Sequence, residues 1–189
     1  MAIDQAFLQN LTLLLLTALI SGLGIPYLLK VVEDRKLRKQ KQFEADLARQ
    51  GKLIDAQSKL LDDLTQILWK WRYLAKSVVY YRSRSDKERY DAARKQYEDN
   101  VWNLLNEFRT EISRSRRLVS EGAFQNLNSL YDYVVHDLDL KISNLISEDT
   151  PDVPEDFRKM ADRFSEEVSK RLDEALNDLA SELHLKVRA

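Results

Sequence analysis

The sequence predicts an all-α fold, and three observations support this prediction. Gly and Pro number only 4 and 3 among 189 residues, far below the usual share of roughly 12%. β-Sandwiches, barrels and doubly wound sheets need those residues in their turns. Apolar residues recur at the helical spacing of three and four along most of the chain, and a long uncharged segment lies near the N-terminus. We therefore expect an N-terminal single transmembrane helix that continues through a charged stalk into an antiparallel up-down four-helix bundle.

The transmembrane helix is predicted at residues 7–29, after a short extracytoplasmic N-terminus of residues 1–6. Residues 11–29 read LTLLLLTALISGLGIPYLL and carry no charge. At about 1.5 Å per residue they approach the ~30 Å thickness of the hydrocarbon core. A cleaved signal peptide is the alternative, but it needs a positively charged start and a shorter apolar core. Here Asp4 precedes the apolar segment and basic residues follow it, so we expect a retained anchor.

Basic residues after this segment predict its orientation. Residues 1–29 contain no Lys or Arg, whereas residues 30–41 contain Lys30, Arg35, Lys36, Arg38, Lys39 and Lys41. Because Lys and Arg stay on the cytoplasmic side, we expect the N-terminus outside and a cytoplasmic helical domain. The same cations would contact anionic headgroups at about 1 kcal/mol each. No transit-type sequence is present, which favours the cell (inner) membrane of a bacterium.

Four small or special residues within the span predict transmembrane packing: Ala18, Gly22, Gly24 and Pro26. Ala18 and Gly22 lie four residues apart, which permits close approach of a second helix. Pro26 cannot donate to the carbonyl of Gly22, so a bend is plausible. The pattern suits an oligomer contact or a pore lining, but we favour a lipid-facing anchor that tolerates Gly and Pro.

The stalk is predicted at residues 30–50 and the cytoplasmic bundle at residues 51–189. A first apolar row advances by steps of four and three through Phe43, Leu47, Ile54, Leu61, Leu64, Leu68, Trp71, Ala75 and Val78, with Gln50 and Gln57 at the two missing positions. A second row at intervals of seven contains Leu53, Leu60, Ile67, Leu74 and Tyr81. Together they predict a wide apolar face from about residue 53, which is typical of a globular bundle rather than a two-stranded coiled coil.

Three more helices are predicted from capping and loop signals. Ser85 to Glu88 match a capping box, Gly122 marks the next break, and the acidic stretch 148–156 holds two prolines. Asp152 or Thr150 would cap the last helix. The expected core faces are Tyr90, Ala93, Tyr97, Val101, Leu104, Phe108 and Ile112, then Leu118 or Val119; Phe124, Leu127, Tyr131, Val134, Leu138, Ile142 and Leu145; and Phe157, Ala161, Phe164, Val168, Leu172, Ala175, Leu179 and Leu183.

The net charge of −1 hides an uneven distribution. Residues 30–117 carry 22 Lys/Arg against 14 Asp/Glu, a net of +8, and residues 118–189 carry 8 against 16, a net of −8. In an up-down bundle the basic and acidic helices can pair with each other. Contact between the oppositely charged ends of two subunits is the alternative. Because exposed ion pairs contribute little energy, either arrangement mainly sets register.

Few residues in the chain support catalysis. There is no Cys and there are two His, which excludes thiolate zinc sites and a Cys nucleophile. No phosphate-binding glycine loop, G-x-S-x-G or H-E-x-x-H motif occurs. Asp132, His136 and Asp139 share one helical face and could ligate a metal with help from a second helix. The Glu-x-x-His repeat of di-iron bundles is missing, so we expect an exposed polar face, no metal, no cofactor and no enzyme.

Two groups of basic residues could bind anions. Arg114, Arg116 and Arg117 at the end of the second helix could contact a phospholipid or another anionic ligand, or could simply interact with the helix dipole. Residues 69–73 and 80–84 interleave aromatic and basic side chains, as nucleic-acid grooves do. Because Trp71 and Tyr81 fall on the predicted core face, we do not expect nucleic-acid binding.

These patterns predict a non-catalytic, single-pass membrane protein that acts as a scaffold or adaptor, or as a subunit of a membrane complex. We expect a homo-oligomer or a membrane-complex partner protein. One alternative is a membrane effector or channel-like subunit whose bundle senses a signal and whose transmembrane segments oligomerise. A second alternative is an RNA- or nucleotide-binding helical module.

Overall fold

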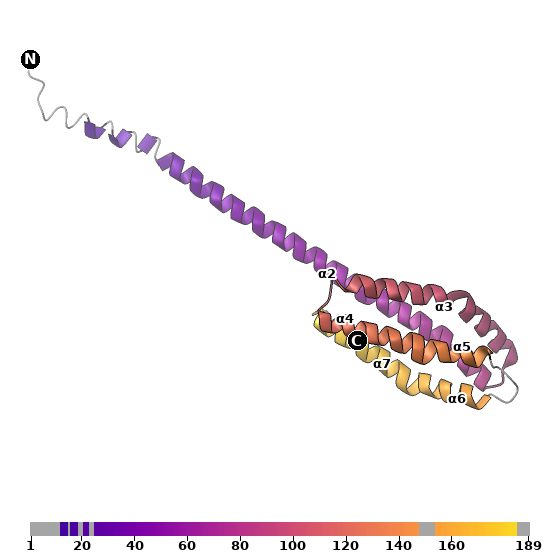
Figure 1. The fold of residues 1–189 in the computed structure, drawn as a ribbon. Helices are drawn as coiled ribbons and strands as arrows, with labels where there is room; N and C mark the ends of the chain where they lie inside the picture. Colours follow the sequence, from indigo (N-terminus) through magenta and orange to yellow (C-terminus); the bar gives the residue numbers. More distant parts are fainter. Residues whose placement is uncertain (1–11, 15, 19–20, 23–24, 148–153, 185–189) are drawn as a thin grey trace, which may run out of the picture. The chain divides into compact units, whose positions relative to one another are not determined.

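The computed structural model describes residues 12–14, 16–18, 21–22, 25–147 and 154–184, and every regular element in those ranges is helical (Figure 1). The prediction of an all-α chain is therefore confirmed. The chain divides into two compact units, Met1–Lys52 and Leu53–Ala189. Helix α2 (Ile25–Ser83) contributes residues to both units.

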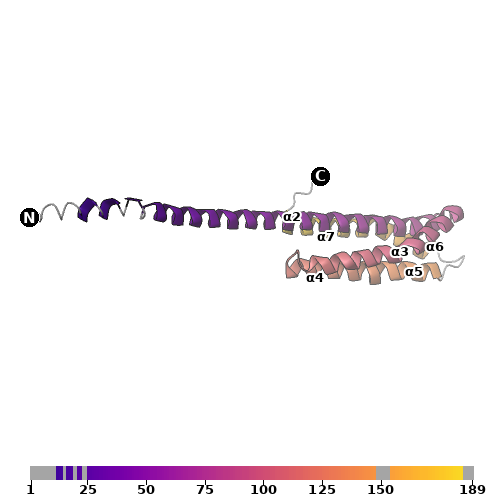
Figure 2. The same cartoon turned by 90° about the horizontal axis from the view of Figure 1, so that it is seen from above.

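The second unit contains three further helical rods after α2. They are α3 (Lys87–Ser115), then α4 (Glu121–Asp132), η2 (Tyr133–Asp139) and α5 (Leu140–Ser147) in direct succession, and finally α6 (Pro154–Arg163), η3 (Phe164–Val168) and α7 (Ser169–Glu182). Figures 1 and 2 both show these rods side by side with the last part of α2, and consecutive rods run in opposite directions. η2 and η3 are π-helical segments, which close wider turns than an α-helix does.

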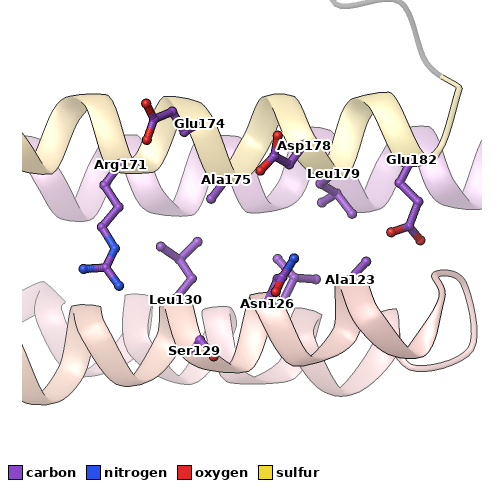
Figure 3. A pocket seen from close by; sticks show the side chains of 11 residues that line it. Ala123, Asn126, Ser129, Leu130, Arg171, Glu174, Ala175, Asp178, Leu179 and Glu182 are labelled. Atoms are coloured by element: carbon purple, nitrogen blue, oxygen red, sulfur yellow. The ribbon is translucent and has the colours of Figure 1, made fainter.

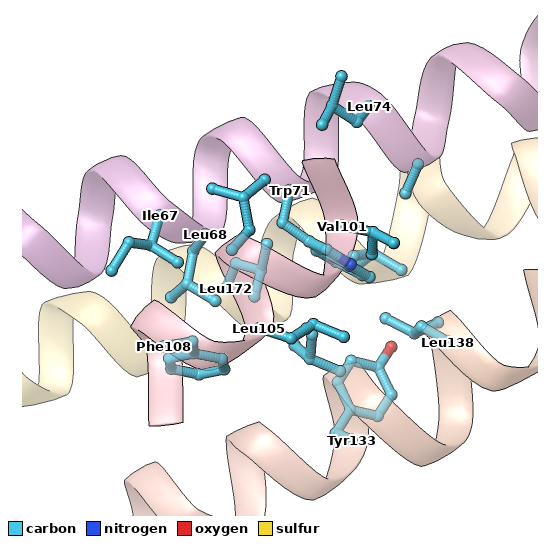
Figure 4. Packing of buried hydrophobic residues seen from close by; sticks show 14 of the residues in the cluster. Ile67, Leu68, Trp71, Leu74, Val101, Leu105, Phe108, Tyr133, Leu138 and Leu172 are labelled. Atoms are coloured by element: carbon cyan, nitrogen blue, oxygen red, sulfur yellow. The ribbon is translucent and has the colours of Figure 1, made fainter. Parts of the chain in front are cut away.

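All four rods of the second unit contribute to one apolar core (Figure 4). Trp71 of α2 packs against Phe164 of η3 with ring centroids 5.8 Å apart, and Tyr90 of α3 packs against Phe157 of α6 at 6.0 Å. The predicted positions Leu64, Leu68, Trp71, Ala75 and Val78 of α2 are buried, as are Tyr97, Val101, Phe108, Leu138, Ile142 and Leu172 in the other rods. Burial of large aromatic side chains dominates the energetics of such a core.

The predicted wide face of α2 begins later than expected. Leu53 and Ile54 are 44% and 54% exposed, and the first fully buried residue is Leu60. Gln57 Nε2 donates a hydrogen bond to the carbonyl oxygen of Leu118 at 2.7 Å, in the connection between α3 and α4. Because α3 ends at Ser115, the helices that cover α2 stop near Gln57, and Ile54 stays exposed.

In the third and fourth rods, several of the buried positions differ from those that the sequence predicted. Phe124, Tyr131, Leu145 and Ala175 are only half-buried, while Ala123, Leu130, Ile146 and Leu176 beside them are buried. In the third rod the buried pairs Tyr133/Leu138 and Val134/Asp139 lie five residues apart. This spacing follows from the i→i+5 hydrogen bonding of η2, which a uniform 3.6-residue period does not anticipate.

Two predicted helix starts need correction. Asp86, not Ser85, is the N-cap of α3, since its side chain accepts a hydrogen bond from the backbone N–H of Arg89 at 3.2 Å; Ser85 has a φ of 56°. Helix α4 is capped by Ser120, whose Oγ accepts from the Ala123 N–H at 3.2 Å, so Gly122 lies inside the first turn. The predicted caps Thr150 and Asp152 lie outside the described residues.

Burial lowers the pKa of Arg72 in α2, and the charge of Asp173 in α7 opposes that shift, which is one interaction of the predicted kind between a basic and an acidic helix. The described ion pairs are mostly of another kind. Most of them join residues three or four apart on one helix, such as Arg94 with Glu98 at 2.7 Å and Arg163 with Glu167 at 3.0 Å. Between helices, Arg114 of α3 lies 3.4 Å from Asp63 of α2, and both residues belong to the basic half of the sequence. Exposed pairs of this kind contribute little stability.

Candidate functional site

The residues predicted to pack within a membrane are described only in part. Ala18 and Gly22 are exposed, and an added Cβ at Gly22 would meet nothing within 4 Å. Pro26 lies in the first turn of α2. Gly24 lies outside the described residues, as do residues 7–11, 15, 19–20 and 23 of the predicted anchor and the predicted extracytoplasmic residues 1–6. In the part of the chain that the structure describes, none of the helices is both long and apolar enough to cross a membrane.

Polar side chains in this segment satisfy their hydrogen bonds locally. The hydroxyl of Thr17 donates to the carbonyl oxygen of Leu13 at 2.7 Å, and the hydroxyl of Ser21 donates to the carbonyl oxygen of Thr17 at 2.7 Å. Each hydroxyl donates to the carbonyl oxygen one turn earlier, which is the usual arrangement for Ser and Thr inside a helix. Neither hydroxyl therefore depends on water for a hydrogen-bond acceptor.

The six predicted headgroup contacts all lie on the first turns of α2. Lys30, Arg35, Lys36, Arg38, Lys39 and Lys41 are exposed. With 3.6 residues per turn, consecutive positions are rotated by about 100°, so these six cations spread over roughly two-thirds of the helix circumference instead of forming one stripe.

A second feature of the same part of α2 is a row of exposed apolar side chains, here called the exposed seam. It consists of Leu29, Val32, Leu37, Phe43 and Leu47, which are 48–64% exposed. Phe43 and Leu47 belong to the 4–3 spacing that the buried residues of α2 continue. Large apolar groups on one side of an exposed helix indicate an interaction surface.

The candidate metal row of Asp132, His136 and Asp139, which we did not expect to bind a metal, is divided in the structure because Asp139 is buried in the core. Asp132 and His136 are exposed, whereas Asp139 is 7% exposed. Its Oδ1 accepts a hydrogen bond from Trp71 Nε1 at 3.3 Å and a shorter one from the Tyr97 hydroxyl. The prediction that Asp139 lies on an exposed polar face is therefore wrong, and the phase shift of η2 is the reason. Among the described residues, no group of three or more His, Cys, Asp or Glu side chains could hold a metal ion.

Burial changes the acidity of this cluster. Desolvation raises the pKa of Asp139 above the usual range of a carboxyl group, and the hydrogen bonds from Tyr97 and Trp71 oppose that rise. Burial, and then the nearby carboxylate, raises the pKa of Tyr97 far above its ordinary value. Three rods, α2, α3 and η2, thus meet at one carboxylate. Perturbed carboxyl groups also occur at catalytic sites, but here both donors are side chains of the core.

A shallow hollow of about 330 Å³ lies between α4 and α7 (Figure 3). Glu174, Asp178 and Glu182 of α7 line it together with Arg171 on the same helix and Asn126 and Ser129 of α4. Glu182 Oε1 accepts a hydrogen bond from the backbone N–H of Ser120 at 2.8 Å, which ties the end of α7 to the start of α4. Sequence reasoning missed this hollow, because facing positions on two rods carry no joint sequence signal.

The three arginines considered as a possible anion contact have separate surroundings. Arg114 Nη1 lies 3.2 Å from Glu111 Oε2 and 3.4 Å from Asp63 Oδ2, so its charge already faces two carboxylates. The guanidinium of Arg116 lies 5.7 Å from the ring centroid of Phe124. Arg116 and Arg117 are exposed at the end of α3.

The interleaved aromatic and basic residues are largely used within the fold. Trp71 is 1% exposed, and the guanidinium of Arg72 lies 4.6 Å from the ring centroid of Trp69 and bonds to Ser169 Oγ. The guanidinium of Arg82 lies 5.7 Å from the Tyr90 ring and 5.9 Å from the Phe157 ring. Tyr73 is 67% exposed, as expected for a side chain outside the core.

Comparisons of this chain with protein-family models, with curated proteins and with solved structures find no match.

Proposed function

We propose that this chain is a non-catalytic, single-pass membrane protein whose antiparallel up-down four-helix bundle acts as a scaffold or adaptor, or as a subunit of a membrane complex. The observation that carries the proposal is the apolar surface of its N-terminal segment. Leu13, Leu14 and Leu16 are 61–70% exposed, and Tyr27 and Leu29 beyond them are 69% and 58% exposed. A surface of this kind is costly in water and favourable in hydrocarbon.

The internal hydrogen bonds of Thr17 and Ser21 support the same proposal. A polar group in hydrocarbon is costly unless it is paired, and these two hydroxyls already bind carbonyl oxygens of their own segment. The cluster of cations after residue 29 then favours the orientation with the N-terminus outside and residues 30–189 in the cytoplasm.

The proposal that the protein is non-catalytic rests on the surroundings of its two histidines and of the buried Asp139. His136 and His184 are both exposed. The buried carboxylate of Asp139 receives hydrogen bonds from two core donors, Trp71 and Tyr97. The outer face of the bundle and the stalk from Arg35 to Gln50 are the surfaces left for partner proteins.

Alkaline carbonate extraction and labelling of single cysteines test the membrane part directly. The natural chain contains no Cys, so Gln5→Cys and Ala45→Cys each introduce one thiol. We expect the chain to stay in the carbonate-resistant membrane pellet. A membrane-impermeant maleimide should label Gln5→Cys in intact cells and should label Ala45→Cys only after lysis. Release of the chain by carbonate would overturn the proposal, and the opposite labelling pattern would overturn its orientation.

Mild-detergent purification followed by mass spectrometry tests the scaffold part. We expect either a defined partner protein at constant stoichiometry or a homo-oligomer of the chain. Recovery of a monomer without partners in mild detergent, together with purely monomeric behaviour on crosslinking in membranes, would contradict the scaffold proposal.

The channel-like alternative is favoured by one observation. Gly22 lies four residues after Ala18, and the space where its Cβ would lie is open, so a second helix could approach closely there. Expression of the chain should then cause dye leakage that Gly22→Leu abolishes. Absence of leakage in both cases excludes a pore.

A further inference from the structure

We propose that the exposed seam of α2 binds the same seam of a second copy of this chain, in a parallel and in-register coiled coil. This inference rests on the proposed membrane anchoring, because anchors inserted from the same side hold two copies parallel and at the same depth. It adds the partner, the orientation and the register to that proposal.

The first argument is the heptad spacing. With Phe43 at position d and Leu47 at position a, the a and d positions from residue 29 onward are Leu29, Glu33, Lys36, Gln40, Phe43, Leu47 and Gln50. Three of the five members of the exposed seam, Leu29, Phe43 and Leu47, therefore lie at the centre of the interface. Knobs of this kind bury their side chains in holes of the facing helix, which removes exposed apolar area from water.

The second argument is the pairing of the flanking positions. In a parallel coiled coil a g residue faces the e residue five positions later on the partner. Val32 at g then faces Leu37 of the partner subunit, so both remaining members of the exposed seam are covered. Lys39 at g faces Glu44 of the partner subunit, which is a pair of opposite charge. In a single copy Glu44 Oε1 accepts from Gln40 Nε2 at 2.9 Å, so its carboxylate already leans toward the a-position side of the helix.

The third argument is the place of the polar residues. All charged residues from 41 to 50, namely Lys41, Glu44, Asp46 and Arg49, lie off the a and d positions. Gln40 and Gln50, which occupy a and d, can hydrogen-bond their own counterparts only when the two copies are in register. A shifted register would place a carboxamide against Phe43 or Leu47 without a partner, which is costly in a buried interface. A polar residue in an otherwise apolar seam specifies register at some cost in stability.

Glu33 and Lys36 limit the strength of the pairing. They occupy neighbouring a and d layers with opposite charges, and their long stems can carry the charged ends out to water. Two charged layers make a short coiled coil weak on its own. The anchors raise the effective concentration of one copy near the other, so the pairing is expected in membranes and should be lost on dilution in detergent.

Disulfide crosslinking of the full chain in membranes tests this proposal. Phe43→Cys and Leu47→Cys place the thiol at the centre of the interface, and Ala45→Cys and Ala48→Cys are matched controls on exposed positions off the seam. We expect oxidation to form dimers at least fivefold faster for the seam variants than for the controls. Equal rates at all four positions would overturn the proposal.

A charge swap tests the orientation and register without altering the apolar contacts. In the Leu47→Cys background, Lys39→Glu should slow crosslinking at least threefold, and adding Glu44→Lys should restore it. Lys41→Glu, which changes the net charge equally but lies off the interface, should leave the rate unchanged. Slowing without rescue, or equal slowing by Lys41→Glu, would exclude the proposed pairing. Circular dichroism of the purified variants shows whether each keeps its helix content.

Carbonate extraction of the same membranes separates this proposal from the proposed function. Membrane retention with equal crosslinking at seam and control positions would refute the coiled coil and leave the anchor standing. Release by carbonate would refute the anchor.

Discussion

The buried Asp139 allows a quantitative test of the core. Its side chain accepts hydrogen bonds from Trp71 and Tyr97, which lie on two other rods. Replacing it with Ala removes the acceptor that the Trp71 indole N–H and the Tyr97 phenol O–H share. An orphaned buried donor costs about 1–3 kcal/mol, so we expect Asp139→Ala to lower the free energy of unfolding by about 2–4 kcal/mol. Asp139→Asn keeps a carbonyl acceptor and should cost less than about 1 kcal/mol at neutral pH.

The pH dependence of these variants follows from the raised pKa of Asp139. The unfolded chain releases this proton in the ordinary carboxyl range, whereas the folded chain holds it to higher pH. The folded state therefore binds more protons than the unfolded state between the two pKa values, and this group's contribution to stability falls as pH rises through that window. Since Asn cannot titrate, the stability of Asp139→Asn relative to the natural chain should increase with pH from the ordinary carboxyl range upward.

Urea unfolding of the full chain in mild detergent, followed by tryptophan fluorescence and near-UV circular dichroism, measures both effects. Tyr97→Phe supplies a double-mutant cycle with Asp139→Ala, and we expect the two losses to be strongly non-additive because they remove one shared interaction. Losses below about 0.5 kcal/mol for Asp139→Ala, the range of ordinary surface substitutions, would refute the core role of this carboxylate. A difference between Asn and Asp that does not change with pH would refute the reasoning about its pKa.

Three further predictions concern the helix ends and one helix interior. Ser85 has a φ of 56°, in the left-handed region that favours Gly. Ser85→Gly should therefore raise the free energy of unfolding by about 1 kcal/mol, and the β-branched Ser85→Val should lower it. Thermal melts of the two variants and the natural chain measure both effects. Ser120→Ala removes the Oγ acceptor of the Ala123 N–H and should cost about 1 kcal/mol in the same melts, whereas Ser113→Ala, on the exposed face of α3, should cost little. An added Cβ at Gly51 meets nothing within 4 Å, so Gly51→Ala should strengthen α2 by roughly 1 kcal/mol and slow limited proteolysis near that residue.

The sequence was sufficient for the element order and for most of the core, because the apolar spacing is strong in each rod. Leu64, Leu68 and Trp71 of α2, Tyr97 and Phe108 of α3, and Phe164 and Leu172 of the last rod are buried where the 3.6-residue period puts them. Helix ends were harder to predict, because Ser85 and Asp86 are both good caps and only backbone geometry distinguishes them. The acidic hollow between α4 and α7 was missed because it depends on which faces meet.

Asp139 was misplaced for a different physical reason. The prediction treated residues 124–145 as one uniform α-helix, and on such a helix Asp139 falls beside Asp132 and His136. The i→i+5 bonds of η2 turn the chain less per residue than the i→i+4 bonds of an α-helix do, so Val134 and Asp139, five residues apart, come to the same side. No residue in Tyr133–Asp139 predicts the change from α- to π-helix, since none is Gly or Pro. When a polar residue lies next to an apolar row in the sequence, as Asp139 does beside Leu138, only the structure shows whether it faces the core or the solvent.

Helix α2 shows most clearly why an apolar row does not identify what covers it. The 4–3 spacing is the same at Phe43 and Leu47 as at Leu64 and Leu68, yet the first two are 64% and 50% exposed and the last two are buried. What distinguishes the two stretches is the glutamines in the row. Gln57 at one such position donates to the Leu118 carbonyl where the neighbouring helices end, so its carboxamide marks the limit of the intramolecular core. Gln40 and Gln50 occupy equivalent positions in the exposed stretch, and by the same chemistry they fit the axis of a symmetric helix pair, where each carboxamide finds its own counterpart.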